Sequence, residues 1–195
     1  MSRAVLFDLG GVLLPFDPER RVRAIAAATG AAPDAIRSLF AGDLPGRMDL
    51  GEADERDYAA AFSGLAGRTV DPEEAIDLIL SVFEAPNAAL WSLAARLAEQ
   101  IRVGGFSDNP PFVRRVFPTG AWLEPMLFSA QIGACKPSAA AFAAAEAALG
   151  LSPDAIVFVD DSPANVAAAL ARGWDALHFT GEGALMAALA ARGLL

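Results

Sequence analysis

Five short apolar runs occur along the chain, at residues 4–7, 101–106, 126–129, 155–159 and 176–179. A run that is apolar throughout is typical of a strand covered on both faces, as in a parallel sheet. In the second half of the chain these runs alternate with stretches that have helical spacing. The pattern therefore predicts an α/β fold with a doubly wound parallel sheet.

A block of helical pattern separates the first two predicted strands. Asp17-Pro18 and Asp71-Pro72 each combine an N-cap residue with a proline suited to the first turn of a helix. We therefore predict two domains. Residues 1–15 and 96–195 form a core domain around the sheet, and residues 16–95 form a small helical cap inserted after the first strand.

Composition narrows the class of protein. The 195 residues include 24 Asp and Glu but only 15 Lys and Arg, for a net charge of −9, and 54% of the chain is hydrophobic. Such a chain is not of the disordered class, and its acidic surface argues against a nucleic-acid partner. The longest stretch without a charged residue has eleven positions, too few to span a bilayer. The single cysteine and the absence of a long apolar leader favour a cytoplasmic protein without a membrane partner; the oligomeric state stays open.

Polar residues follow the predicted strands at the ends where ligands bind in open α/β sheets. Asp8 and Gly10-Gly11 follow the first strand, Ser107-Asp108-Asn109 the second, and Asp160-Asp161-Ser162 the fourth. Lys136, the only lysine of the chain, precedes the helix that leads into the fourth strand. Carboxylates gathered at one edge would repel each other, so a divalent cation is expected among them. An all-oxygen set with few carboxylates suits Mg²⁺.

These residues resemble the four motifs of the haloacid dehalogenase-like hydrolases, in the family's order. The motifs correspond to Phe7-Asp8-Leu9-Gly10-Gly11-Val12-Leu13, Phe106-Ser107-Asp108-Asn109, Cys135-Lys136-Pro137, and Val159-Asp160-Asp161-Ser162 through Asn165. The helical insertion, with Arg47-Met48-Asp49-Leu50-Gly51-Glu52, is similar to the cap of the subgroup that includes sugar-phosphate phosphatases. The resemblance implies a Mg²⁺-dependent phosphatase of a small phosphorylated metabolite, such as a sugar phosphate.

The resemblance also implies a role for each motif residue. Asp8 matches the nucleophile, which forms an aspartyl-phosphate. Asp8, the backbone carbonyl of Gly10 and the side chain of Asp161 match the Mg²⁺ ligands. Ser107 and the backbone amide of Asp108 match the groups that hold phosphoryl oxygens.

The two remaining site residues are charged. Lys136 would neutralise charge on nucleophile and phosphate, and Asp160 would orient the lysine or metal-bound water. Gly10 departs from the family, whose phosphatases usually have there a second aspartate that serves as general acid and base. Asp17 is a candidate substitute, although its position favours an N-cap. Two alternatives therefore stay open: a non-catalytic relative that binds phosphorylated ligands or a protein, and a 2-haloacid dehalogenase that needs no metal.

Structural roles are expected for several other polar residues near the motifs. Ser162 fits an N-cap and Asn165 an anchor for the fourth motif. Cys135 is expected to pack as an inert thiol, and His178 to be packed or hydrogen-bonded within the last strand.

Overall fold

In the computed structural model, which describes residues 3–117 and 122–195, five strands form one parallel sheet in the order β3-β2-β1-β4-β5. The strands are β1 (Ala4–Phe7), β2 (Arg102–Ser107), β3 (Leu123–Phe128), β4 (Ile156–Asp160) and β5 (Asp175–His178). β1 is central and pairs with β2 and β4. Asp8 therefore emerges at the middle of the sheet's carboxyl edge, and the predicted α/β fold is confirmed.

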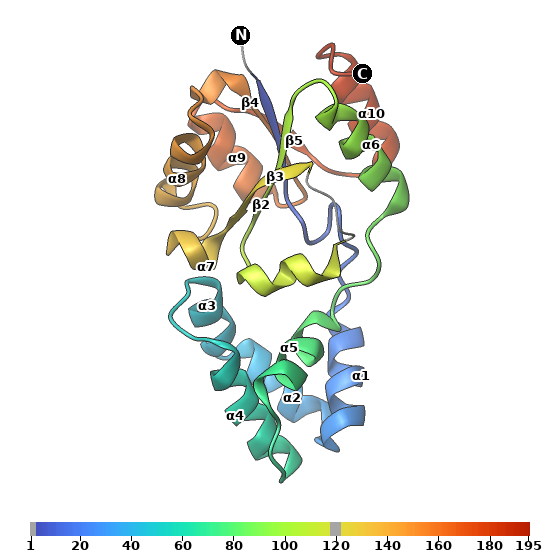
Figure 1. Ribbon diagram of the computed structural model, residues 1–195, viewed down its shortest axis with the longest axis vertical. Coiled ribbons are helices and arrows are strands. Elements are labelled where there is room, and N and C mark those ends of the chain that lie inside the picture. Colours follow the sequence, from blue (N-terminus) through green and yellow to red (C-terminus); the bar gives the residue numbers. More distant parts are fainter. Residues whose placement is uncertain (1–2, 118–121) are drawn as a thin grey trace.

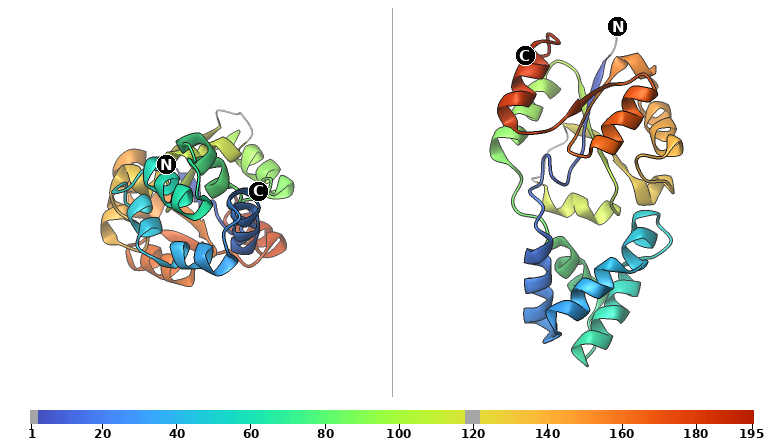
Figure 2. Two further views of the ribbon diagram at one scale, coloured as in Figure 1. Left: turned by 90° about the horizontal axis from the view of Figure 1, so that it is seen from below. Right: turned by 180° about the vertical axis from the view of Figure 1, so that it is seen from behind.

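Helices cover both faces of the sheet (Figures 1 and 2). The helices on one face are α6 (Ala88–Ala98) and α10 (Glu182–Ala190), and those on the other are α8 (Ala139–Leu149) and α9 (Pro163–Ala171). Side chains of β1 alternate between the faces, so Val5 and Phe7 pack with the first pair of helices, whereas Ala4 and Leu6 pack with the second. This two-sided burial is the reason that β1 is apolar at every position.

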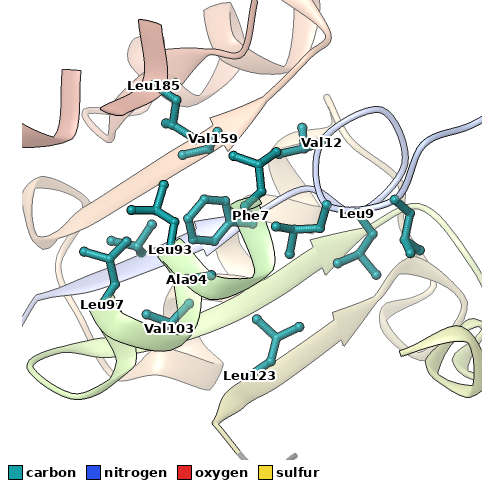
Figure 3. Close-up of a cluster of buried hydrophobic side chains, with 14 of the residues drawn as sticks. Phe7, Leu9, Val12, Leu93, Ala94, Leu97, Val103, Leu123, Val159 and Leu185 are labelled. Atoms are coloured by element: carbon teal, nitrogen blue, oxygen red, sulfur yellow. The ribbon is translucent and has the colours of Figure 1, made fainter. Parts of the chain in front are cut away.

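Helix α6 packs against the sheet, although the sequence pattern assigned residues up to 95 to the cap. Its Leu93 lies beside the Phe7 ring, Leu97 lies further along the same helix, and Leu185 of α10 belongs to the same cluster (Figure 3). Each such leucine contributes about 1.5–3 kcal/mol by its burial. Helical spacing identifies the apolar face of α6 but not the core that this face joins. The boundary between the two cores lies after Ile79, which is the last buried residue of the cap's own cluster.

The insertion forms a separate helical cluster beyond the carboxyl ends of the strands (Figure 1). Its helices are α1 (Pro18–Thr29), α2 (Pro33–Ala41), α3 (Leu44–Asp49), α4 (Glu55–Ala66) and α5 (Pro72–Leu80). Asp17 accepts a hydrogen bond from the Glu19 amide and Asp71 from the Glu74 amide, so both predicted N-caps are present. Ile25, Ile36 and Phe62 are completely buried among these helices, which gives the cap a core of its own.

Of the three remaining short elements, two lie where cap and sheet domain meet. They are α7 (Ser129–Ile132), the 3₁₀ helix η1 (Pro111–Val116) and, away from the cap, the 3₁₀ helix η2 (Pro153–Ala155). Arg115 of η1 pairs with Glu73 of α5, with 2.6 Å between guanidinium and carboxylate atoms. Helix α3 lies against α7 (Figures 1 and 2). Among the described helices, none has the length and hydropathy of a membrane span.

Candidate active site

Asp8, Asp160 and Lys136 form a buried ionic cluster at the carboxyl edge of the sheet. The Lys136 Nζ donates hydrogen bonds to Asp8 Oδ1 at 2.8 Å, to Asp160 Oδ2 at 2.9 Å and to the Phe106 carbonyl at 2.8 Å. An ammonium group has three N–H donors, so all of them are used. The Lys136 side chain is only 1% exposed. The lysine is therefore a fixed positive charge that cannot swing away from Asp8.

The charged groups in this cluster shift one another's pKa values. Burial raises the pKa of Asp8 to about 6, against the lowering effect of Lys136, and Asp160 adds to the rise. Burial also acts to lower the pKa of Lys136, but the carboxylates of Asp8, Asp160 and Asp108 outweigh it and hold that pKa above its ordinary value. At neutral pH the lysine is thus charged and Asp8 is mainly ionised, as a carboxylate nucleophile must be.

Asp160 is held from several sides. Its Oδ1 accepts from the Ser162 amide at 2.7 Å, and Asn165 Nδ2 lies 3.0 and 3.2 Å from its two oxygens. With Lys136 on Oδ2, both oxygens are engaged, and the residue is fully buried. Asp160 is thus suited to positioning the lysine. Asn165 anchors this turn as expected, and Ser162 caps α9 through the Asn165 amide.

An all-oxygen cluster lies beside the lysine. Oxygens of Asp8, Asp160 and Asp161 lie within 4.8 Å of one another. Gly11 has a φ of 79°, and a Cβ there would overlap the Asp161 carboxylate, so only glycine lets this turn approach so closely. Gly10 belongs to the same turn. Because Asp160 is engaged elsewhere, Asp8, Asp161 and the Gly10 carbonyl are the donors that fit Mg²⁺ by their chemistry.

The loop after β2 places further polar residues at the carboxyl edge of the sheet. Ser107 is 1% exposed, and its Oγ accepts from Asn109 Nδ2 at 2.9 Å. Asp108 Oδ1 accepts from the Lys136 amide at 3.0 Å. This bond ties the β2 loop to the loop before α8, so Ser107 and Asp108 sit next to the lysine. Their predicted contacts with phosphoryl oxygens stay predictions.

Gly10 lies against aromatic rings. A Cβ at this position would meet Phe16 and Phe83, each at 3.9 Å, which is ordinary van der Waals contact. The two rings form a tilted pair with centroids 5.9 Å apart, and Phe16 is 49% exposed. Neither backbone strain nor crowding at the Cβ requires glycine here. The side of the site next to Gly10 is therefore apolar and lacks a carboxyl group of its own.

Asp17, the candidate substitute acid, is engaged in capping α1. Beyond its bond from the Glu19 amide, it pairs with Arg23 at 3.1 Å. Desolvation is the largest single influence and acts to raise its pKa, but hydrogen bonds from the Arg20 amide, Arg23 and the Glu19 amide together hold the pKa below its ordinary value. Asp17 is thus an ionised helix cap rather than a proton donor.

Two further residues near the motifs have simple roles. Burial raises the pKa of Cys135, whose thiol donates to the Asp49 carbonyl at 3.6 Å, so it is an unreactive contact as expected. His178 ends β5, and its Nε2 lies 3.0 Å from the Asp161 carbonyl oxygen. Asp49 of the cap interacts through its charge with Asp108, and the sequence marks it only as part of the cap motif. Helical spacing cannot reveal which cap residue faces the core.

A family model described as haloacid dehalogenase-like hydrolase matches residues 2–173. The chain belongs to this family. Among curated protein sequences, none matches it.

Solved structures of the haloacid dehalogenase-like (HAD) family share the fold. A HAD family enzyme of Bacteroides thetaiotaomicron, in complex with magnesium and inorganic phosphate, has 20% identity and a TM-score of 0.81, covering 93% of this chain and 96% of that one. A predicted HAD-like hydrolase of Porphyromonas gingivalis has 27% identity and a TM-score of 0.81, covering 98% of each chain. A 2-haloacid dehalogenase of Pseudomonas syringae has 19% identity and a TM-score of 0.67, covering 92% of this chain and 86% of that one.

Proposed function

We propose that this HAD-family hydrolase is a Mg²⁺-dependent phosphatase of small phosphomonoesters, with Asp8 as its nucleophile. The observation that carries the proposal is the buried Lys136 between Asp8 and Asp160, with the Asp161 carboxylate beside them. A phosphate dianion approaching an anionic nucleophile needs positive charge on both sides of the reacting oxygens. Lys136 supplies part of this positive charge at a fixed position.

In the first step an Asp8 oxygen attacks phosphorus in line with the leaving oxygen and forms an aspartyl-phosphate. Lys136 stays on Asp8 and stabilises the charge that accumulates there, while Asp160 keeps the lysine in place. Ser107 and the Asp108 amide would hold phosphoryl oxygens. Mg²⁺ bound by Asp8, the Gly10 carbonyl and Asp161 would neutralise the remaining phosphate charge. Water then attacks phosphorus, which releases phosphate and restores Asp8.

A sugar phosphate is the substrate class we favour, within a cytoplasmic, soluble protein. The cap contributes Asp49, whose charge interacts with that of Asp108, and Arg21 beside Asp49; such polar groups suit hydroxyl-bearing leaving groups better than aliphatic ones. The net charge of −9 gives no long-range attraction for an anion. Binding therefore depends on the local cluster around Lys136.

Dehalogenation is the second candidate, supported by the structural likeness to a 2-haloacid dehalogenase. That reaction uses the same nucleophile on a substrate with a single negative charge. The Asp161 carboxylate argues against it, since without a cation it adds repulsion beside Asp8 and Asp160. Such a cluster suits a metal-dependent reaction.

The test is release of inorganic phosphate from a broad panel of phosphomonoesters, measured with Mg²⁺ and again with EDTA. We expect turnover with Mg²⁺ that EDTA abolishes. Halide release from 2-chloropropionate in EDTA would instead assign the dehalogenase reaction. Calorimetric binding of a sugar phosphate with no turnover of any substrate would identify a non-catalytic relative and overturn the proposal.

A further inference from the structure

The cap touches the core next to the loop that carries Lys136. Helix α3 ends at Asp49, whose carbonyl oxygen accepts the hydrogen bond from the Cys135 thiol. Two residues further on, Gly51 lies so close to the core that a Cβ would overlap the Ala130 carbonyl. In Figure 1, α3 faces α7 across this contact. The backbone of Asp49 is therefore held at the contact between cap and core, beside the loop that carries Lys136.

The Asp49 side chain is a partly buried carboxyl group without a hydrogen bond from any described residue. Burial raises its pKa to about 7, and the nearby Asp108 carboxylate adds to the rise, whereas Arg21 opposes it. The titratable groups that face it are Arg21 of α1, Tyr58 of α4, Asp108 after β2 and Cys135 before α8. A substantial fraction of Asp49 is thus protonated at neutral pH.

The described acidic groups at the carboxyl edge of the sheet each have a partner or belong to the candidate cation site. Lys136 uses its three donors, and Asp160 accepts on both oxygens. Burial raises the pKa of Asp108 against the lowering effect of Lys136, but its Oδ1 accepts from the Lys136 amide and so ties it to the lysine loop; Asp161 belongs to the oxygen cluster suited to a cation. Gly10 brings no carboxyl group. Asp49 differs from these groups in that it lies on the cap and its side chain accepts no hydrogen bond from a described residue.

In-line attack fixes where that proton is needed. Asp8 lies at the carboxyl edge of the sheet, so the leaving oxygen is on the far side of phosphorus, toward the cap (Figure 1). An alkoxide is a strong base and needs a proton as its bond to phosphorus breaks. We propose that Asp49 donates this proton, which makes it a catalytic residue contributed by the cap. This inference rests on the proposed phosphatase activity.

An Asp8 oxygen forms a bond to phosphorus while the bond from phosphorus to the ester oxygen breaks. That bond's electron pair stays on the ester oxygen, which takes the Asp49 proton and departs as the alcohol. In the second step a water oxygen attacks phosphorus, its proton passes to the Asp49 carboxylate, and the bond to Asp8 breaks. Phosphate is released, and both carboxyl groups return to their starting states.

The test compares Asp49→Asn with a matched control, Asp34→Asn, which removes an acid of the same cap whose side chain is 96% exposed. Alcohol or phenol release is measured in single turnovers with Mg²⁺, at saturating enzyme, for glucose 6-phosphate and p-nitrophenyl phosphate. We expect Asp49→Asn to slow the alkyl substrate by about 10²-fold or more, the usual contribution of general acid catalysis. The aryl substrate leaves as a stable anion and should slow by less than about threefold.

Equal slowing of both substrates by Asp49→Asn, or no slowing of the alkyl one, would overturn the donor role while leaving the phosphatase proposal intact. Absence of turnover by the unmodified protein on either substrate would overturn both. A second readout needs no turnover: the carbon-13 carboxyl signal lost in Asp49→Asn should titrate with a midpoint near 7 in the unmodified protein. A midpoint near 4 would mean that Asp49 is ionised at neutral pH and cannot donate.

Discussion

The two sides of the candidate site differ in how far their polar groups are satisfied. On the sheet side, Lys136 makes three hydrogen bonds and both Asp160 oxygens are engaged. On the cap side, the Arg21 Nε is buried without a partner in the described part of the chain. The Asp49 carboxyl group likewise accepts no bond from a described residue. Buried polar groups without partners are destabilising unless a ligand completes them.

This difference matches the two halves of the proposed substrate. The phosphoryl group is the same in every phosphomonoester, so the residues that bind it can be held in position before the substrate arrives. The leaving group varies between substrates, and the cap presents polar groups whose bonds a substrate can complete. Arg21 is held flat over the Phe40 ring, 3.6 Å from its centroid, which orients the guanidinium without using its N–H donors.

The largest effect is expected for a residue on the sheet side of the site. Asp8→Asn should reduce turnover by at least about 10⁴-fold, the order of loss for a catalytic nucleophile. Because the folded state raises the pKa of Asp8 to about 6, ionised Asp8 makes folding less favourable as pH rises from about 4 to 6. In EDTA at pH 7 the variant should therefore gain about 1–3 kcal/mol in free energy of unfolding, measured with urea. Activity above a few per cent would exclude Asp8 as nucleophile.

The next effect separates the two neighbouring aspartates. Asp161→Ala should raise the Mg²⁺ concentration needed for half-maximal rate by at least about tenfold, because one of two carboxylate ligands is lost. High Mg²⁺ should restore much of the rate. Asp160→Ala should instead leave Lys136 short of a partner and lower stability more than Mg²⁺ affinity. A larger Mg²⁺ defect in Asp160→Ala would reverse the assignment.

The residues on the sheet side of the site could be predicted from the sequence because the strands determine where they lie. Asp8, Ser107 and Asp160 each follow or end an apolar run, and parallel strands bring such ends to one edge. The cap motif includes Asp49 but does not say where its side chain lies, because that depends on how α3 docks against α7. The same limit applies to α6, whose apolar spacing fits either core. Contacts between domains are long-range, so periodicity within one helix carries no information about them.

The smallest effect tests whether a carboxyl group on the sheet side can replace Asp49 as the proton donor. A Cβ at Gly10 would contact the Phe16 and Phe83 rings at 3.9 Å, and Gly10 does not have a positive φ, so Gly10→Asp can be made without strain at the backbone or Cβ. Combined with Asp49→Asn, it brings a carboxyl group from the sheet side to replace the cap's proton donor.

Single-turnover rates of the double variant should recover in the order of the leaving group's need for a proton. We expect the primary alkyl phosphate to regain most, to within about tenfold of the unmodified protein, an anomeric 1-phosphate to regain less, and p-nitrophenyl phosphate to change by less than about threefold. The apolar rings beside the new carboxyl group favour its neutral form, which is the form that donates. Equal recovery for all three substrates would mean that Gly10→Asp acts on metal or phosphate binding, and proton donation would then not be what Asp49→Asn removes.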